Sequence, residues 1–225
     1  YRSNEVRQKL IAANVEQLVI VVACEPAFSD DLVTRALIAA ESEEIGVLIV
    51  LNKCDLTAQI DRARQQTRIF ADQGYTILEL SARDHAEDLR PWLQGKTSVL
   101  VGQSGMGKST LVNALIPKAG AATREISQAL DSGKHSTTHA TLYHLDAESH
   151  LIDSPGLQEF GLGHLDKQEI EWAFPEFRPY LGQCRFRDCK HDREPDCALR
   201  PAVDTGKIEK SRFASYRRLV GLPPL

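Results

Sequence analysis

A glycine-rich segment follows a short apolar run near the middle of the chain. The run at residues 98–101 is followed by Gly102, four further residues and then Gly107, Lys108 and Ser109, which is the spacing of a phosphate-binding loop. Glycines allow backbone N–H groups to curl around phosphate oxygens, and a helix beginning near Lys108 adds the positive end of its dipole. We expect Lys108 to assist the reaction by reaching the β- and γ-phosphates, and Ser109 to bind Mg²⁺. The residues expected to contact the nucleotide here are Gly102, Gln103, Ser104, Gly105, Met106, Gly107, Lys108, Ser109 and Thr110.

Two polar motifs suited to recognising guanine precede this loop. They are Asn52, Lys53, Cys54 and Asp55 after one apolar run, and Ser81 and Ala82 after another. The Asp55 carboxylate can accept two hydrogen bonds from guanine, a pairing that adenine does not offer. Lys53 would lie along the base, Asn52 would brace the neighbouring loops, and the Ala82 N–H would face the base carbonyl. Taken alone, the first motif could also be a solvated loop at the end of a strand.

The order of these motifs is permuted. In ordinary GTPases the guanine motifs follow the phosphate loop, whereas here they precede it by about fifty residues. A permuted order is physically tolerable because the folded sheet sets the geometry of a site, and chain ends close in space can be rejoined.

Alternating apolar runs and helical stretches position these motifs. The runs lie at 18–23, 47–51, 76–80, 98–101, 141–145 and 151–152, and helical patterns lie at 32–42, 60–73 and 108–115. This alternation predicts an α/β fold with a largely parallel sheet, in which ligands bind beyond the carboxyl ends of the strands. We predict a circularly permuted P-loop GTPase domain over residues 1–165.

Two later segments have the residues of nucleotide-sensing switches. Thr137, with Thr138 as the neighbouring alternative, could bind Mg²⁺ through its hydroxyl and contact the γ-phosphate. Asp153 and Gly156 fit the D-x-x-G pattern, in which Asp153 holds Mg²⁺ through water and the Gly156 N–H meets the γ-phosphate. Many GTPases place a water-orienting Gln next, but this chain has Leu157.

His135 is the candidate that could orient the attacking water instead, because an imidazole forms hydrogen bonds near neutral pH. A histidine that only packs against its loop is the alternative.

A cluster of soft ligands lies near the end of the chain. Cys184, Cys189, His191 and Cys197 supply three thiols and one imidazole within fourteen residues, the ligand set of a closed structural Zn²⁺ site. Unligated cysteines are the alternative. We predict a small C-terminal zinc-binding domain of helices and loops over residues 166–225, with a charged helical stretch near 207–220.

Charge is distributed unevenly along the chain. Residues 1–183 carry a net charge of −8 and residues 184–225 carry +4. Arg185, Arg187, Lys190 and Arg193 interleave with Phe186 and could bind a phosphate backbone, although a merely solvated charged face would look the same.

The apolar runs are far shorter than the roughly 20 residues that cross a bilayer, so no membrane association is expected. An odd number of cysteines, five, argues against a secreted disulfide framework and favours the cytoplasm.

With these motifs in this order, the chain resembles the circularly permuted, ribosome small subunit-dependent GTPase A family of bacteria (RsgA, also called YjeQ or EngC). The resemblance covers essentially the whole chain. It implies a cytoplasmic, rRNA-binding GTPase that acts late in maturation of the small ribosomal subunit and uses GTP/GDP, Mg²⁺ and one structural Zn²⁺. In this family the histidine matched here by His135 is the proposed catalytic group.

The chain departs from the family pattern at two points. Family members carry an N-terminal OB-fold domain, and this chain begins at about the point where that domain would end. Close relatives often have Thr where this chain has Ser136, which leaves open which hydroxyl binds Mg²⁺.

Three functions remain to be separated. Besides a GTPase, which we expect to be a monomer, the sequence allows a nucleotide-regulated ribosome-binding module with negligible intrinsic hydrolysis. A P-loop ATPase or kinase is a further alternative, and the guanine-selective Asp55 disfavours it.

Overall fold

A six-stranded sheet forms the centre of the molecule. The computed structural model describes residues 14–116, 140–154 and 162–223. The strands are β1 (Gln17–Ala23), β2 (Gly46–Asn52), β3 (Thr76–Glu79), β4 (Thr97–Val101), β5 (Thr141–His144) and β6 (His150–Asp153), in the spatial order β3-β2-β1-β4-β6-β5. All neighbouring strands are parallel except β5, which runs antiparallel to β6. The predicted α/β class and its largely parallel sheet are confirmed.

The central strands are continuous apolar runs because both of their faces are covered. Every residue of β1 is buried, as expected for a parallel strand between two layers of helices. The pairing of Ala23 with Asn52, and of Leu100 with Asp153, brings the carboxyl ends of neighbouring strands to one edge of the sheet. Several predicted functional residues follow these strand ends.

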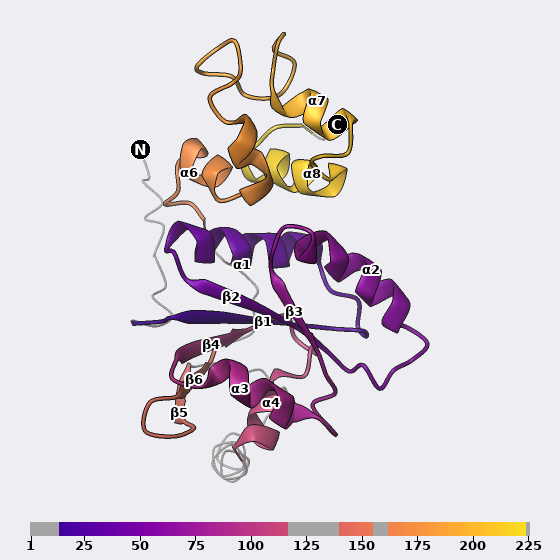
Figure 1. The fold of residues 1–225 in the computed structure, drawn as a ribbon, viewed down its shortest axis with the longest axis vertical. Coiled ribbons are helices and arrows are strands. Elements are labelled where there is room, and N and C mark those ends of the chain that lie inside the picture. Colours follow the sequence, from indigo (N-terminus) through magenta and orange to yellow (C-terminus); the bar gives the residue numbers. More distant parts are fainter. Residues whose placement is uncertain (1–13, 117–139, 155–161, 224–225) are drawn as a thin grey trace, which may run out of the picture.

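Helices cover both faces of the sheet. Figure 1 shows α1 (Asp30–Ser42) and α2 (Ile60–Ala71) on one face, and α3 (Arg90–Leu93) and α4 (Lys108–Leu115) on the other. A short 3-10 helix, η1 (Ala86–Leu89), leads into α3. Helix α1 begins two residues earlier than the apolar pattern indicated, because Ser29 is its N-cap and Asp30 and Asp31 occupy its first turn, where carboxylates are favourable.

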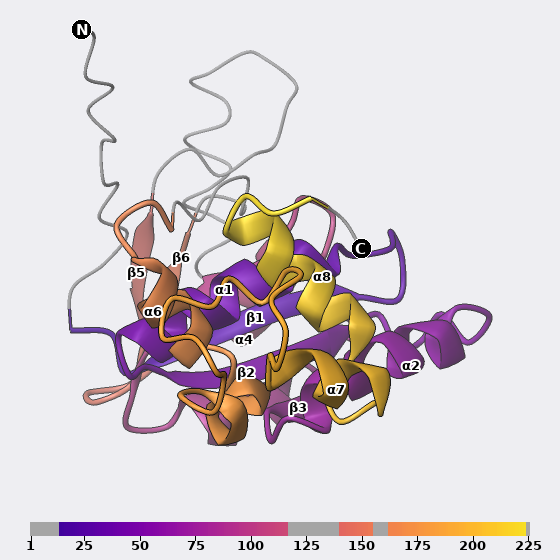
Figure 2. The ribbon, with the colours of Figure 1, turned by 90° about the horizontal axis from the view of Figure 1, so that it is seen from above.

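The C-terminal helices pack as a separate layer above α1 (Figures 1 and 2). They are α6 (Lys167–Trp172), the 3-10 helix η2 (Pro175–Tyr180), α7 (Leu199–Asp204) and α8 (Lys210–Leu219). Their own hydrophobic cluster includes Phe174, Phe177 and Tyr216, and it also takes in Ile38 of α1. Within the described ranges, none of the helices has the length and apolar composition needed to span a bilayer.

Candidate nucleotide site and metal cluster

The buried amide of Asn52 joins three loops at the carboxyl edge of the sheet. Its Nδ2 donates a 2.9 Å hydrogen bond to the Met106 carbonyl in the glycine-rich loop. Its Oδ1 accepts hydrogen bonds from the backbone N–H groups of Lys53, at 2.8 Å, and Ala82, at 2.9 Å. One side chain thereby holds the phosphate-loop motif and both guanine motifs in fixed relative positions.

Close packing around Asn52 explains why the loop needs glycine. A Cβ on Gly107, whose φ is +93°, would lie 2.3 Å from Asn52 Nδ2. A Cβ on Gly102 would lie 2.3 Å from the Val21 carbonyl oxygen. Both contacts are far below van der Waals separation, so a larger residue would push the glycine-rich loop away from Asn52 at Gly107 and away from β1 at Gly102.

Lys108 is a buried cation in the first turn of α4. Its ammonium donates hydrogen bonds to the carbonyls of Gly102, at 2.6 Å, and Gln103, at 3.2 Å. Burial lowers its pKa, and the negative charge of Asp153 opposes that shift. The ammonium is therefore held against the phosphate loop, within the electrostatic influence of the carboxylate that ends β6.

Two residues predicted to hold Mg²⁺, Ser109 directly and Asp153 through water, lie on the elements that follow or pair with β4. Ser109 lies exposed in the first turn of α4, and Asp153 is buried at the end of β6. Strand β6 pairs with β4, the strand that leads into the phosphate loop. A hydroxyl and a carboxylate at one edge of the sheet are suitable oxygen donors for Mg²⁺.

The guanine motifs combine an exposed carboxylate with buried neighbouring residues. Asp55 is exposed, whereas Ser81 and Ala82 are buried. The Cys54 N–H donates a 3.2 Å hydrogen bond to the Leu80 carbonyl, which fixes the first motif beside the second. Lys53, with a positive φ of 63°, donates from Nζ to the Glu25 carbonyl at 2.7 Å.

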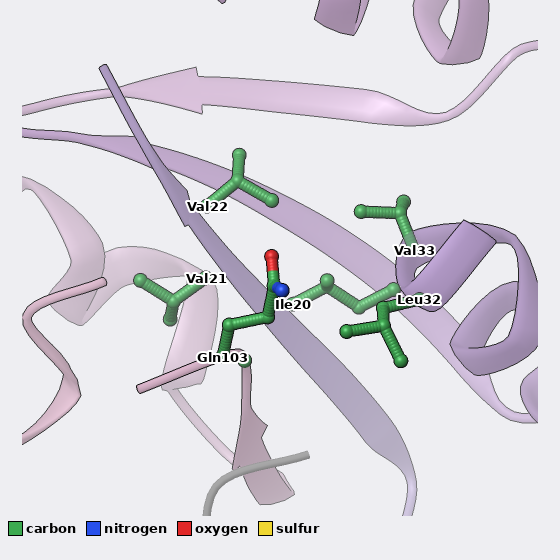
Figure 3. A pocket seen from close by; sticks show the side chains of 7 residues that line it. Ile20, Val21, Val22, Leu32, Val33 and Gln103 are labelled. Atoms are coloured by element: carbon green, nitrogen blue, oxygen red, sulfur yellow. The ribbon is translucent and has the colours of Figure 1, made fainter. Parts of the chain in front are cut away.

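Within the phosphate loop, Gln103 has a structural contact that the sequence did not indicate. Its Oε1 accepts a 2.8 Å hydrogen bond from the N–H of Ser29, the N-cap of α1. Figure 3 shows Gln103 beside apolar side chains from β1 and α1, which line a cavity of about 10 Å³. That space is far too small for a nucleotide.

The remaining loop residues form an open surface. Ser104, Gly105 and Thr110 are exposed, and Met106 is buried beneath the loop. Three predicted switch residues, His135, Thr137 and Gly156, lie outside the described residues.

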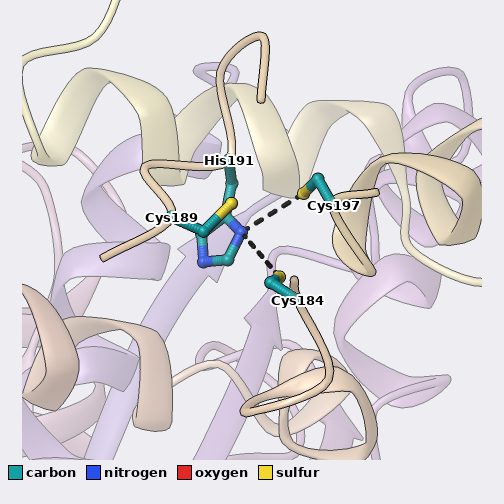
Figure 4. A group of neighbouring side chains, drawn as sticks. All are labelled: Cys184, Cys189, His191 and Cys197. Carbon is teal, nitrogen blue, oxygen red and sulfur yellow. Dashed lines mark hydrogen bonds between the residues drawn. The ribbon is translucent and has the colours of Figure 1, made fainter. Parts of the chain in front are cut away.

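The three cysteines and the histidine predicted to bind metal do meet in space. The ligand atoms of Cys184, Cys189, His191 and Cys197 all lie within 4.8 Å of one another. Figure 4 shows the His191 ring facing the thiols, with Nδ1 3.6 Å from Cys184 Sγ and 3.3 Å from Cys197 Sγ. Tetrahedral zinc with ordinary bond lengths would separate nitrogen and sulfur ligands by roughly 3.5 Å. The donor set and its spacing therefore fit zinc.

This cluster is largely buried. Cys189, His191 and Cys197 are each at most 5% exposed. Burial raises the pKa of the Cys189 thiol to about 12 and also raises that of Cys197.

Sequence reasoning missed one residue beside the cluster, Glu171. Its helix, α6, was detectable, because Asp166 and Glu169 form a capping box with reciprocal side-chain to backbone hydrogen bonds of 2.8 Å and 2.7 Å. The pairing of Glu171 with His191, at 3.1 Å, was not detectable, because no local pattern links positions so far apart.

Known proteins have sequences similar to that of this chain. The sequence model of the RsgA GTPase family matches residues 1–163. The small ribosomal subunit biogenesis GTPase RsgA of Nitrosospira multiformis is 51% identical over 98% of this chain and 70% of its own length. The protein of the same name from Nitrosomonas europaea is 53% identical over 98% of this chain and 71% of its own length.

Solved structures share the fold. YloQ, described as a circularly permuted GTPase, aligns with a TM-score of 0.72 and 29% identity over 92% of this chain and 68% of its own chain. YjeQ from Thermotoga maritima aligns with a TM-score of 0.72 and 31% identity over 92% of this chain and 70% of its own. The family match, the extent of identity and the permuted fold agree, and the chain belongs to the RsgA GTPase family.

Proposed function

We propose that this chain binds GTP at the edge of the sheet where its three motif loops meet, hydrolyses it to GDP and phosphate, and acts in biogenesis of the small ribosomal subunit. The observation that carries this proposal is the set of three hydrogen bonds made by Asn52, which hold the phosphate loop and both guanine motifs in one arrangement.

Each part of the site has a separate task in this proposal. Asp55 selects guanine by accepting hydrogen bonds from the base, and the Ala82 N–H faces the base carbonyl. Lys108 and the loop amides neutralise and orient the phosphates, so the charge that develops during phosphoryl transfer meets preorganised donors. The contacts of Asn52 favour this assignment because they leave little freedom for the base-binding loop relative to the phosphate loop.

Magnesium would be held by Ser109, Thr137 and, through water, Asp153. When bound, the cation neutralises charge on the phosphate oxygens. The Gly156 N–H would sense the γ-phosphate, and His135 would orient the attacking water in place of the glutamine that Leu157 replaces. Loss of the γ-phosphate would then release both switch segments.

The C-terminal unit, residues 166–225, supplies the ribosome-facing surface in this proposal. Cys184, Cys189, His191 and Cys197 would hold one structural Zn²⁺, which fixes the loop between them. That loop projects Arg185 and the 41% exposed Phe186, with the guanidinium 5.5 Å from the ring centroid. An exposed cation and aromatic ring suit an RNA backbone and an unpaired base.

We propose that the chain works as a cytoplasmic monomer on small subunits. The printed names of its relatives support the small subunit as the partner. The net charge of +4 over residues 184–225 supports binding to rRNA.

Steady-state turnover of GTP and ATP, with small ribosomal subunits titrated and large subunits as the control, tests this function. Hydrolysis selective for GTP and stimulated by small subunits alone is expected. Binding of GTP to the subunit-bound chain without stimulated turnover would instead favour a nucleotide-regulated docking module.

A further inference from the structure

The carboxylate of Glu171 contacts three hydrogen-bond donors inside the C-terminal unit. Its Oε1 accepts a 2.6 Å hydrogen bond from the Tyr216 hydroxyl, lies 2.9 Å from Lys167 Nζ and lies 3.1 Å from His191 Nε2. Glu171 is 8% exposed and Tyr216 is fully buried. A carboxylate buried this deeply requires such donors to compensate for its lost hydration.

The contact with His191 defines how the imidazole must be protonated. Because Nε2 faces a carboxylate, the ring carries its proton on Nε2 and donates it to Glu171. The lone pair of Nδ1 is then directed at the thiols of Cys184 and Cys197, 3.6 Å and 3.3 Å away (Figure 4). This is the tautomer that a metal bound at Nδ1 requires.

We propose that Glu171 is a positioning residue of the metal centre, holding the His191 ring in the orientation and tautomer that present Nδ1 to the metal. The inference rests on the proposed zinc site. Carboxylates in this outer position raise the basicity of the ligating nitrogen and fix the ring, and their loss weakens metal binding.

The same carboxylate connects the metal centre to two helices. Glu171 lies on α6, and its partner Tyr216 lies on α8. The Tyr216 ring packs against Phe174 and Phe177, with centroids 5.9 Å and 5.3 Å apart. Glu171 therefore links the metal ligand His191 to both α6 and α8.

Competition for Zn²⁺ between the full chain and a chromophoric chelator tests the proposal. Glu171→Ala is expected to weaken zinc binding by about 10- to 100-fold. Glu171→Gln should recover part of that loss, because its amide oxygen still accepts from Nε2. Glu176→Gln is the matched control: Glu176 is also a carboxylate of this unit with a side chain only 10% exposed, but it pairs with Arg212, so zinc affinity should be unchanged.

A measurement on the wild-type chain keeps the proposal testable if the alanine variant does not fold. A long-range proton–nitrogen correlation spectrum of the zinc-loaded chain should place the His191 proton on Nε2. A proton on Nδ1, or unchanged zinc affinity in Glu171→Ala, would overturn the role of Glu171 while leaving the zinc site intact. Failure of the wild-type chain to bind zinc would overturn both.

Discussion

The guanidinium of Arg212 on α8 donates a 2.9 Å hydrogen bond to the hydroxyl of Thr34 on α1. It also pairs with Glu176 at 2.7 Å and lies 4.5 Å from the centroid of the Phe174 ring. Arg212 is only 2% exposed. The C-terminal layer is therefore attached to the nucleotide-binding layer by a buried, directional contact.

The N-terminal end of α1 contacts the phosphate loop. The Ser29 N–H at its N-cap donates to Gln103 Oε1 at 2.8 Å. A single helix thus contacts a nucleotide-binding loop at its start and the C-terminal helices along its side.

Replacing Arg212 with Met should destabilise the chain by about 3–5 kcal/mol, because Glu176, whose side chain is only 10% exposed, would lose its charged partner. Urea unfolding measures the loss. Arg200→Met, at an exposed arginine of the same unit, should change stability by no more than about 0.5 kcal/mol. The double variant with Glu176→Met should recover part of the loss. If Arg212→Met and Arg200→Met lowered the unfolding free energy equally, the pair of Arg212 with Glu176 would contribute nothing to stability.

Attachment of α8 to α1 should also weaken in acid. Burial raises the pKa of Asp31, but hydrogen bonds from Ser215 and Arg218 outweigh that effect and hold the pKa below its usual value. A carboxyl whose folded pKa is depressed stabilises the fold above its unfolded pKa, about 4, and loses that contribution as the pH falls through the folded pKa.

Asp31→Asn should therefore flatten the dependence of the unfolding free energy on pH below about 5. Asp61→Asn serves as the control, since the Asp61 side chain is 96% exposed and its ion pair is local to α2. If the unfolding free energy of Asp31→Asn depended on pH as that of the wild type does, the Asp31 carboxyl would not be the source of the loss of stability in acid.

Removing the amide of Asn52 should loosen the nucleotide site. Asn52→Ala leaves the Met106 carbonyl and two N–H groups without this partner, at a cost of about 1–3 kcal/mol. Nucleotide affinity should fall by at least about tenfold, as measured with a fluorescent GDP analogue. Asn113→Ala, at an exposed position of α4, should bind as the wild type does. If both variants retain full affinity, Asn52 does not organise the site.

Hydrolysis should depend on His135 if that imidazole orients the water. His135→Ala should reduce GTP turnover stimulated by small subunits by about 100-fold or more, with little change in GDP affinity. His164→Ala, at an exposed histidine, controls for nonspecific effects. Unchanged stimulated turnover in His135→Ala would remove His135 from the mechanism.

Much of the sheet was predictable because its central strands are long and apolar. The run predicted at 18–23 is β1 without its first residue, Gln17, which is also buried. The helix predicted near residues 207–220 is α8, which begins only at Lys210, because its N-cap Glu209 is extended, with a ψ of 133°. Strand ends shift by a residue or two because hydrogen bonding, rather than composition, defines them.

Contacts between distant segments could not be predicted in the same way. The glycine-rich loop and the cysteine cluster are each encoded by local spacing, so the sequence indicated them directly. Arg212 and Thr34 lie 178 residues apart in the chain, and their types alone do not pair them. Glu171 was missed for the same reason, since its role depends on tertiary packing that brings α6 beside His191.

The central claim is that the permuted motifs form a single guanine-specific site, and nucleotide preference tests it most directly. Binding of GTP, ATP and xanthosine triphosphate should be compared for the wild type, Asp55→Asn and the control Asp61→Asn. The wild type and the control should prefer GTP. Asp55→Asn should lose GTP affinity by roughly 100-fold or more and gain xanthosine triphosphate binding. Equal binding of GTP and ATP by the wild type, or unchanged GTP affinity in Asp55→Asn, would contradict the account.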